Sequence, residues 1–233
     1  MQLIRRGNLP LGGFAGLREH RVVTDSRLFG SRKSTATSEG LGNFVYLADA
    51  QFNPKGETGM HPHKEIDVIS VMIDGQVSHA GSLEHGKSLK AGDVQVQRAG
   101  GEGFAHNEIN PDDVKNRMIQ LWVLPEKPGQ PAGYKYYTPN KLGVTHIYGG
   151  KYGKSETKTK TFASKTTIDI VRLKANTCIT LAKESLSYIT SGEAHAVEGN
   201  KSIPITDGDL IRSNGMEINA ITDLNLIVIG QSF

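Results

Sequence analysis

The sequence is poor in the features that mark secreted or membrane-spanning proteins. Among 233 residues there is one cysteine, Cys178, so no internal disulfide can form. We expect Cys178 to be a small buried apolar side chain, as free cysteines often are. No stretch approaches the ~18 consecutive apolar residues of a membrane span. The basic N-terminus has no apolar segment long enough for a secretory signal. These absences predict a cytoplasmic protein without a membrane anchor.

Charge of one sign is also scarce. The net charge is only +3 and the basic residues are scattered along the chain, although the pI is near 8.9. Proteins that bind nucleic acid usually carry a basic patch or stripe. We therefore expect no direct contact with nucleic acid, and we expect the protein to be a monomer.

Glycine and proline, in contrast, are abundant, with 27 and 9 copies. They punctuate short runs rich in strand-forming residues, which is typical of a turn-rich β protein. In the first half these runs are 44–48, 66–73, 76–80, 94–97 and 117–124. Asp74-Gly75 separates two of them and predicts a tight β-hairpin, because type I′ turns favour Asp-Gly. The polar segment Ser31–Ser38 has no apolar periodicity and is expected to be an exposed loop.

The second half repeats this texture. Its strand candidates are 167–173, 177–181, 187–190, 209–212 and 225–229. The segment 189–197 echoes 72–80, which favours two similar β domains. Three prolines within Pro125–Pro131 cannot sit in a central strand, so this segment is the expected boundary. The predicted domains are residues 1–130 and residues 131–233.

Two pairs of metal-binding side chains occur in the first half. His61 and His63 are two residues apart, and so are His106 and Glu108. In a strand, residues i and i+2 point to the same face, so each pair can aim two donors at one point. If the two strands are close, three imidazoles and one carboxylate would suit iron, manganese, cobalt, nickel or zinc. The alternative is that these are surface residues that never meet.

The second half has no equivalent of this site. Neither His-x-His nor His-x-Glu occurs after residue 140. Glu193 and His195 form one spaced pair without a partner pair, and we expect His195 to be an exposed residue of a strand–turn–strand segment. Only the first domain is therefore predicted to bind metal.

Between Phe44 and about Tyr134 the sequence resembles the pirin family, two-domain members of the cupin superfamily. The matching residues cover well over a third of the chain and follow the family's order and spacing. They are His61-Pro62-His63, Asp67, Asp74-Gly75, Gly92-Asp93, Gln95, Ala99-Gly100, Gly103, His106-Asn107-Glu108 and Gln120-Leu121-Trp122-Val123-Leu124-Pro125-Glu126.

This resemblance implies an all-β bicupin, with two antiparallel β-barrel (jelly-roll-like) domains packed face to face. The N-terminal barrel would hold one divalent metal on His61, His63, His106 and Glu108, and the C-terminal barrel would be empty. The metal is usually iron in the family, so we expect Fe(II), with Mn, Co, Ni, Cu and Zn as alternatives.

The resemblance also implies two different functions. Some pirins resemble quercetin 2,3-dioxygenases, which act on flavonol-type enediols. Glu108 would then be the catalytic base, because a carboxylate can move between metal and proton. Met60, Phe104 and Trp122 are candidates for the apolar wall around an aromatic substrate, or else ordinary core residues. Other pirins are described as transcriptional cofactors, so the alternative is a metal-containing module that binds a protein partner.

The chain departs from the family pattern at three places. Asp67 stands where the family usually has Glu, and Gly101-Glu102 lengthens the glycine-rich loop by one residue. Residues 1–40 lack the His-x-Phe-Ser-Phe pattern that is common near the family's N-terminus. The resemblance therefore specifies the metal ligands better than the substrate.

Overall fold

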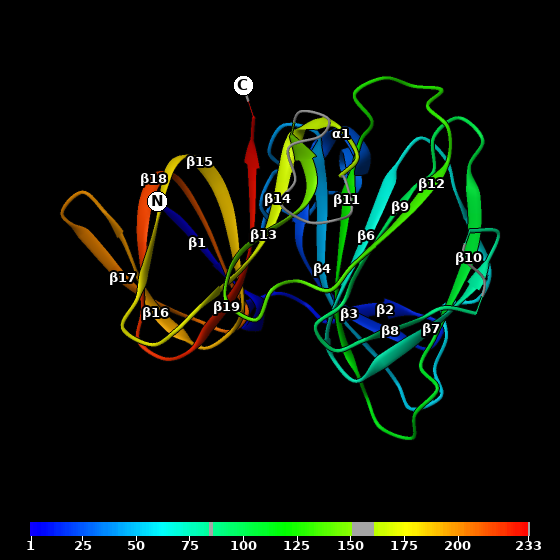
Figure 1. Cartoon of the computed structure of the whole chain (residues 1–233), viewed down its shortest axis with the longest axis horizontal. Coiled ribbons are helices and arrows are strands. Elements are labelled where there is room, and N and C mark those ends of the chain that lie inside the picture. Colours follow the sequence, from blue (N-terminus) through cyan, green and yellow to red (C-terminus); the bar gives the residue numbers. More distant parts are fainter. Residues whose placement is uncertain (84–85, 151–160, 233) are drawn as a thin grey trace. The chain divides into compact units, whose positions relative to one another are not determined.

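The computed structural model describes residues 1–83, 86–150 and 161–232, and it contains two compact units (Figure 1). The N-terminal unit comprises residues 9–138, and the C-terminal unit comprises residues 1–8 and 139–233. Every pairing between named strands in the described ranges is antiparallel. The pairings are those of β1 with β18, β2 with β3, β3 with β4, β4 with β11, β5 with β10, β6 with β9 and β11, β7 with β8 and β10, β9 with β12, β13 with β14, β14 with β19, β15 with β18 and β19, and β16 with β17 and β18. The predicted all-β fold class is thus confirmed.

The N-terminal unit contains a seven-stranded and a four-stranded sheet. The first has the order β12-β9-β6-β11-β4-β3-β2, and the second has the order β5-β10-β7-β8. Their strands are β2 (Gly12–Phe14), β3 (Leu17–Thr24), β4 (Phe44–Phe52), β5 (His61–His63), β6 (Asp67–Asp74), β7 (Gln76–Gly81), β8 (Ser88–Lys90), β9 (Val94–Arg98), β10 (Phe104–Ile109), β11 (Arg117–Val123) and β12 (Gly133–Tyr137).

The central strands of the larger sheet are buried on both faces. In β4 every residue except Gln51 is buried, and β6 is buried from Asp67 to Met72. Their β-branched and aromatic side chains fit a pleated, two-sided environment. One core cluster joins both sheets, and its buried members are Leu17, Ala50, Phe52, Met72, Val77, Leu89 and Met118.

The predicted hairpin at Asp74-Gly75 is wrong. β6 pairs with β9 and β11, whereas β7 pairs with β8 and β10, so this turn carries the chain from one sheet to the other. Gly75 has φ +71°, but Asp74 is not among the residues with positive φ, so the two do not form a type I′ turn. Asn116 holds the crossing by donating to the carbonyl of Gln76 at 2.8 Å. The crossing brings β7 beside β10.

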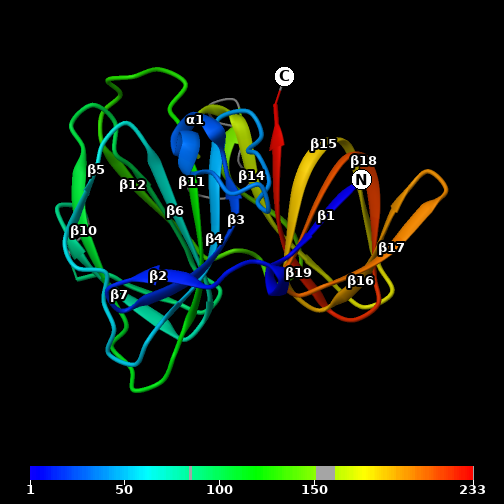
Figure 2. The same ribbon diagram turned by 180° about the vertical axis from the view of Figure 1, so that it is seen from behind.

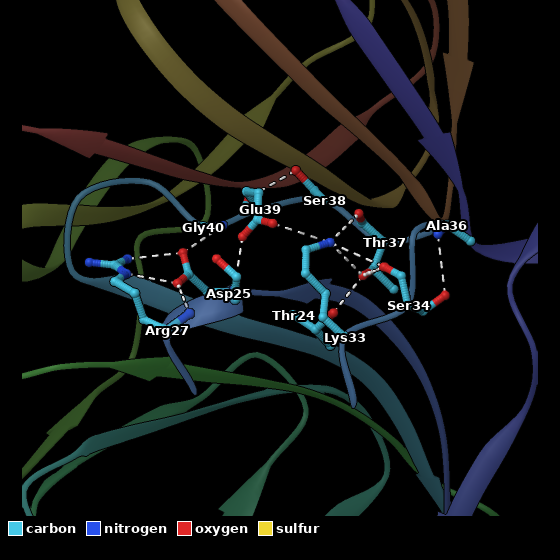
Figure 3. A network of polar contacts seen from close by, with 11 residues as sticks. Thr24, Asp25, Arg27, Lys33, Ser34, Ala36, Thr37, Ser38, Glu39 and Gly40 are labelled. Atoms are coloured by element: carbon cyan, nitrogen blue, oxygen red, sulfur yellow. Dashed lines mark hydrogen bonds and ion pairs between the residues drawn. The ribbon is translucent and has the colours of Figure 1, made fainter. Parts of the chain in front are cut away.

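The segment before β4 is more ordered than predicted for an exposed loop. Figure 3 shows Asp25 at its centre: this side chain caps the short helix α1 (Ser26–Phe29) and accepts from the backbone N–H of Gly40 at 3.1 Å. Lys33 donates to the carbonyl of Thr37 at 3.1 Å. Thr37 and Ser38 are buried, so the prediction for 31–38 is wrong at this end. This segment is not part of a sheet, so side chains take the place of strand partners and hydrogen-bond to its backbone groups.

The C-terminal unit is built on one eight-stranded sheet. Its order is β13-β14-β19-β15-β18-β16-β17, and β1 pairs with β18 off this path. The strands are β1 (Gln2–Arg5), β13 (Gly143–Gly150), β14 (Ser164–Leu173), β15 (Cys178–Ser191), β16 (Glu193–Glu198), β17 (Lys201–Thr206), β18 (Asp209–Ala220) and β19 (Leu224–Gln231). The described residues also form single-turn 3₁₀ helices at Arg6–Asn8 in this unit and at Gly30–Arg32 in the N-terminal unit.

Two expectations for this unit have different outcomes. Cys178 is exposed at the start of β15, so the prediction of a buried cysteine is wrong. Its neighbours on the strand alternate between partly buried and exposed, which places Cys178 on the solvent side. His195 is exposed on β16, as predicted.

The expected boundary lay between residues 130 and 131. In the structure the units divide between residues 138 and 139, and also between residues 8 and 9. β12 follows the proline-rich segment, yet it pairs with β9 and so belongs to the N-terminal unit. β1 pairs with β18 and so joins residues 1–8 to the C-terminal unit. Strand pairing across a long sequence separation is not visible in local composition. None of the described helices has the length and hydropathy required to cross a membrane.

A buried ion pair links β4 and β11. Arg117 donates to both carboxylate oxygens of Asp49, with Nε 3.0 Å from Oδ1. We predict that Arg117→Met lowers the free energy of unfolding by roughly 3–5 kcal/mol, because it removes the guanidinium that pairs with a buried carboxylate. Urea unfolding followed by Trp122 fluorescence measures this change. Asp113→Asn, which breaks an exposed pair with Lys55, should cost below about 0.5 kcal/mol. Equal effects of the two substitutions would contradict the prediction.

A hydrogen bond between His146 and Asp169 makes the stability of the C-terminal unit depend on pH. Burial lowers the pKa of His146, but the hydrogen bond from Nδ1 to Asp169 at 2.6 Å and its charge outweigh this, so the pKa is raised. The stabilisation is therefore complete below the unfolded-state pKa near 6.5 and is lost as pH rises through the higher folded-state value. The difference in unfolding free energy between wild type and His146→Gln should shrink with rising pH. A difference that grows with pH would refute this assignment.

Candidate metal centre

The two predicted ligand strands are neighbours in the four-stranded sheet. β5 and β10 lie side by side (Figure 2) and pair antiparallel. In their register His61 lies opposite His106. Nε2 of His106 is 3.0 Å from Nε2 of His61 and 3.2 Å from Nε2 of His63. One donor atom from each of the three residues lies within 4.8 Å of the other two. The structure thus brings three of the four predicted ligands to one point.

The protons on these rings can be assigned from their partners. Nδ1 of His61 lies 2.9 Å from the carbonyl oxygen of Gly59, which can only accept, so Nδ1 carries the proton. Nε2 of His61 is then a bare lone pair directed at the other imidazoles. Lone pairs about 3 Å apart repel each other unless a cation lies between them. The donor set therefore fits a divalent metal held by imidazole nitrogens.

The same surroundings keep the imidazoles of His63 and His106 neutral. Burial and the neighbouring His61 lower the pKa of His63 to about 4. Burial, followed by His63, His61 and His79, lowers the pKa of His106 to about 2. Neutral imidazole is the form that binds metal, so protons compete weakly for these two ligands.

Glu108, the fourth predicted ligand, is placed differently. It lies on the same face of β10 as His106. Among the described residues, however, the donor atoms that lie within 4.8 Å of one another belong only to the three histidines. Its Oε1 accepts from the hydroxyl of Ser70 at 3.1 Å. Burial raises the pKa of Glu108 to about 7, although the hydrogen bond from Ser70 opposes this. The carboxyl group can therefore hold or release a proton at neutral pH.

A cavity of about 130 Å³ lies beside these residues. Its walls come from both sheets of the N-terminal unit and are mostly apolar or aromatic. They are formed by Phe14, Leu17, Glu19, Arg21, Tyr46, Thr58, His61, His63, Glu108, Gln120 and Trp122. One end is polar: Glu19 accepts from the Tyr46 hydroxyl at 2.7 Å and from Nε of Arg21 at 2.8 Å.

The three predicted substrate contacts occupy different positions. Trp122 is in the cavity wall. Phe104 is buried below the imidazoles, with its ring centroid 5.2 Å from that of His63 and 5.1 Å from that of His106. Met60 is 61% exposed, and neither it nor Phe104 is among the wall residues.

Stacked aromatic rings connect the wall to the helix before β4. Phe29 of α1 stacks on Tyr46 at 5.7 Å between centroids, and Tyr46 stacks on Trp122 at 4.3 Å. Trp122 in turn meets the edge of His63 at 5.9 Å. Such offset contacts restrict the ring orientations, so the capped segment around Asp25 helps to hold one side of the cavity.

Sequence reasoning missed the polar residues behind the ligands. Ser70 contacts Glu108, and His79 and Gln97 contact His106. His79 and Gln97 are buried, and they lie on β7 and β9. Val77 and His79 are two residues apart on β7 and therefore share a face. The apolar Val77 could have indicated that His79 also points inward. Its contact with His106 does not follow from a hairpin at Asp74-Gly75, because a hairpin would pair β7 with β6 and not with β10.

Asp67, which stands where the pirin family usually has Glu, lies in the larger sheet. Asp67 is fully buried and pairs with Nε of Arg98 at 3.3 Å, across the pairing of β6 with β9. The shorter side chain thus takes part in joining two strands of the larger sheet.

Comparison with known proteins agrees with this geometry. The pirin family model, described as "Pirin", matches residues 25–123, a segment that contains all three clustered histidines and Glu108. The chain contains a pirin domain. A putative quercetin 2,3-dioxygenase of Zymomonas mobilis is 36% identical over 81 residues, which is 35% of this chain and 34% of that protein. The quercetin 2,3-dioxygenase of Escherichia coli K12 is 32% identical over 78 residues, 33% of each chain. The alignments thus span about a third of these curated relatives.

Solved structures extend the likeness over both units. The bacterial pirin YhhW from Escherichia coli, in complex with nickel(II), has a TM-score of 0.82 at 16% identity and covers 98% of this chain and 97% of its own. A quercetin 2,3-dioxygenase from Acinetobacter baumannii has a TM-score of 0.73 at 19% identity, covering 99% and 86%. At these identities the likeness shows the fold. In this chain the three-histidine cluster is the group of described side chains that fits a divalent metal.

We predict that His61→Ala or His106→Ala sharply lowers the metal content of the purified protein, because each removes an imidazole from the cluster. Metal analysis by inductively coupled plasma mass spectrometry measures this. His195→Ala, an exposed histidine on β16, should keep wild-type metal content. Affinity should also fall as pH is lowered through about 4, where His63 becomes protonated and can no longer bind metal. Loss of metal in His195→Ala equal to that in His61→Ala would show that the site is misassigned.

Proposed function

We propose that the pirin domain holds one divalent transition metal, Fe(II) in the first instance, and that the protein is a dioxygenase of flavonol-type enediols. His61, His63, His106 and Glu108 would hold the metal. When bound, the metal supplies a Lewis acid that lowers the pKa of a substrate hydroxyl and orients the substrate. The names of the relatives support this proposal, since several are quercetin 2,3-dioxygenases.

The observation that carries the proposal is the position of Glu108. A buried carboxyl group with a pKa near 7 lines the same cavity as His61 and His63. Such a group can take a proton from an enediol hydroxyl and later return it. Ser70 donates to one carboxylate oxygen, so it orients Glu108 and leaves the other oxygen for the substrate or the metal.

The cavity walls support a planar aromatic substrate. Trp122 and Tyr46 present stacked rings on one side, and Phe14 lies edge-on to His61 at 6.5 Å. A cavity of about 130 Å³ is close to the roughly 150 Å³ apolar cavity that admits benzene. It would hold the ring that bears the enediol, and the other rings of a flavonol would lie beyond Phe14, which is 48% exposed.

The alternative is a metal-containing module that binds a protein partner. Exposed apolar side chains around the N-terminal part of the domain favour it, namely those of Leu11, Phe14 and Met60. Such side chains are common at protein contacts. A cytoplasmic location, a monomeric state and the lack of direct nucleic-acid binding stay predictions from composition.

We predict that Glu108→Gln keeps much of its metal while turnover falls about 10²–10⁴-fold, the range usual for loss of a general base. The amide retains an oxygen for the metal but cannot accept a proton. Oxygen uptake by iron-loaded protein with a flavonol panel measures turnover, and metal analysis runs in parallel. Full turnover in Glu108→Gln would remove Glu108 from the chemistry. If iron-loaded wild type consumes no oxygen with any enediol, the protein-binding alternative is favoured.

A further inference from the structure

A buried group of three side chains, none of which lines the cavity, includes His106 of the cluster. Nδ1 of His106 is 3.0 Å from Nε2 of His79 and 3.1 Å from Oε1 of Gln97. Nε2 of Gln97 is 3.1 Å from Nε2 of His79. His106 and Gln97 are fully buried and His79 is 2% exposed, so water cannot replace these contacts.

The amide orientation assigns the protons in this group. Oε1 of Gln97 accepts, so Nδ1 of His106 must donate, and the Gln97 amide N–H must donate to a bare Nε2 of His79. His106 then carries its single proton on Nδ1. Its Nε2 lone pair is left facing His61 and His63, as a metal ligand requires.

One other arrangement satisfies the same contacts. If the Gln97 amide turns over, its N–H donates to Nδ1 of His106 and its oxygen accepts from Nε2 of His79. The proton of His106 then lies on Nε2, which can donate to Nε2 of His61 at 3.0 Å. Each ring keeps one proton, but the lone pair needed for metal is now used inside the cluster. The two arrangements differ only in the amide orientation and in which nitrogen carries each proton.

We propose that Gln97 and His79 are positioning residues that hold His106 in its metal-binding tautomer. The orientation of the Gln97 amide determines which nitrogen of His106 carries the proton. His79 accepts a hydrogen bond from the amide N–H of Gln97 and so holds the amide in this orientation. Metal affinity therefore depends on two side chains that do not touch the metal. The backbone of His79 is held by Lys87 and Gly86, with hydrogen bonds of 2.9 and 2.8 Å. The acceptor thus has a fixed position in β7.

This inference rests on the metal centre of the proposed function and deepens it. The test uses Zn²⁺ alone, which is diamagnetic and needs no substrate. Gln97→Met, which keeps the length but loses both polar atoms, should weaken Zn²⁺ binding about 10- to 100-fold in a chelator competition. His79→Phe should do the same, and the double variant should be little worse than either, because the residues act as one unit. Gln97→Glu retains an acceptor for Nδ1 of His106 and should stay close to wild-type affinity.

A spectroscopic readout on the wild type tests the tautomer directly. Long-range ¹H–¹⁵N NMR of the Zn²⁺-loaded protein should show His106 protonated at Nδ1 and metal-bound at Nε2. The matched control is Asn225→Leu, which removes another strand amide, one that donates to the Ser191 hydroxyl at 2.7 Å in the C-terminal unit. It should lower the unfolding free energy but leave Zn²⁺ affinity unchanged.

The outcomes separate the two proposals. Zn²⁺ binding by wild type that Gln97→Met does not weaken overturns the positioning role and leaves the metal centre standing. A His106 proton on Nε2 in the loaded protein, or equal weakening by Asn225→Leu, also overturns it. Wild type that binds no Zn²⁺ overturns both the metal centre and this inference.

Discussion

The arrangement of the N-terminal unit depends on one constraint: imidazole nitrogens from two half-buried histidines and one buried histidine meet at one point. His61 and His106 lie opposite each other in a strand pair, and His63 follows two residues after His61. Antiparallel pairing of β5 with β10 sets the separation of the rings within narrow limits. Because like partial charges repel strongly at low dielectric, this packing is stable only with a cation or with a proton shared between rings. The surrounding polar groups determine which of these holds.

Most of those groups are buried and hydrogen-bonded to one another, whereas the side chain of Arg21 is 50% exposed. Ser70 donates to Glu108, and Tyr46 and Arg21 donate to Glu19. Leaving any of these acceptors unpaired would cost about 1–3 kcal/mol or more, so each pair limits the rotamers of its neighbours. The cavity thus has rigid polar ends and aromatic sides, which suits a site that must orient a small planar molecule.

The chain crossing at Gly75 has a larger effect than its length suggests. A hairpin there would have kept β7 beside β6 in the larger sheet. Instead β7 pairs with β10, and His79 lies opposite Glu108 in the register. The crossing therefore supplies the inner wall of the metal centre. In the C-terminal unit β15 and β16 are likewise joined at Gly192 without pairing with each other. The echo between 72–80 and 189–197 thus reflects a shared non-hairpin connection.

Local sequence was sufficient for the all-β class, for many of the strands and for the spacing of the ligand pairs. These depend on side-chain alternation and turn residues within a few positions. The meeting of β5 with β10 was inferred only as a condition, and the family resemblance supplied it. Tertiary structure alone decided the partners of His106, the exposure of Cys178 and the pairing of β1 with β18. The reason is physical: strand pairing joins residues tens to hundreds of positions apart, and its choice depends on the total burial of both sheets. Residues such as Gln97 look like ordinary strand residues until the strand opposite them is known.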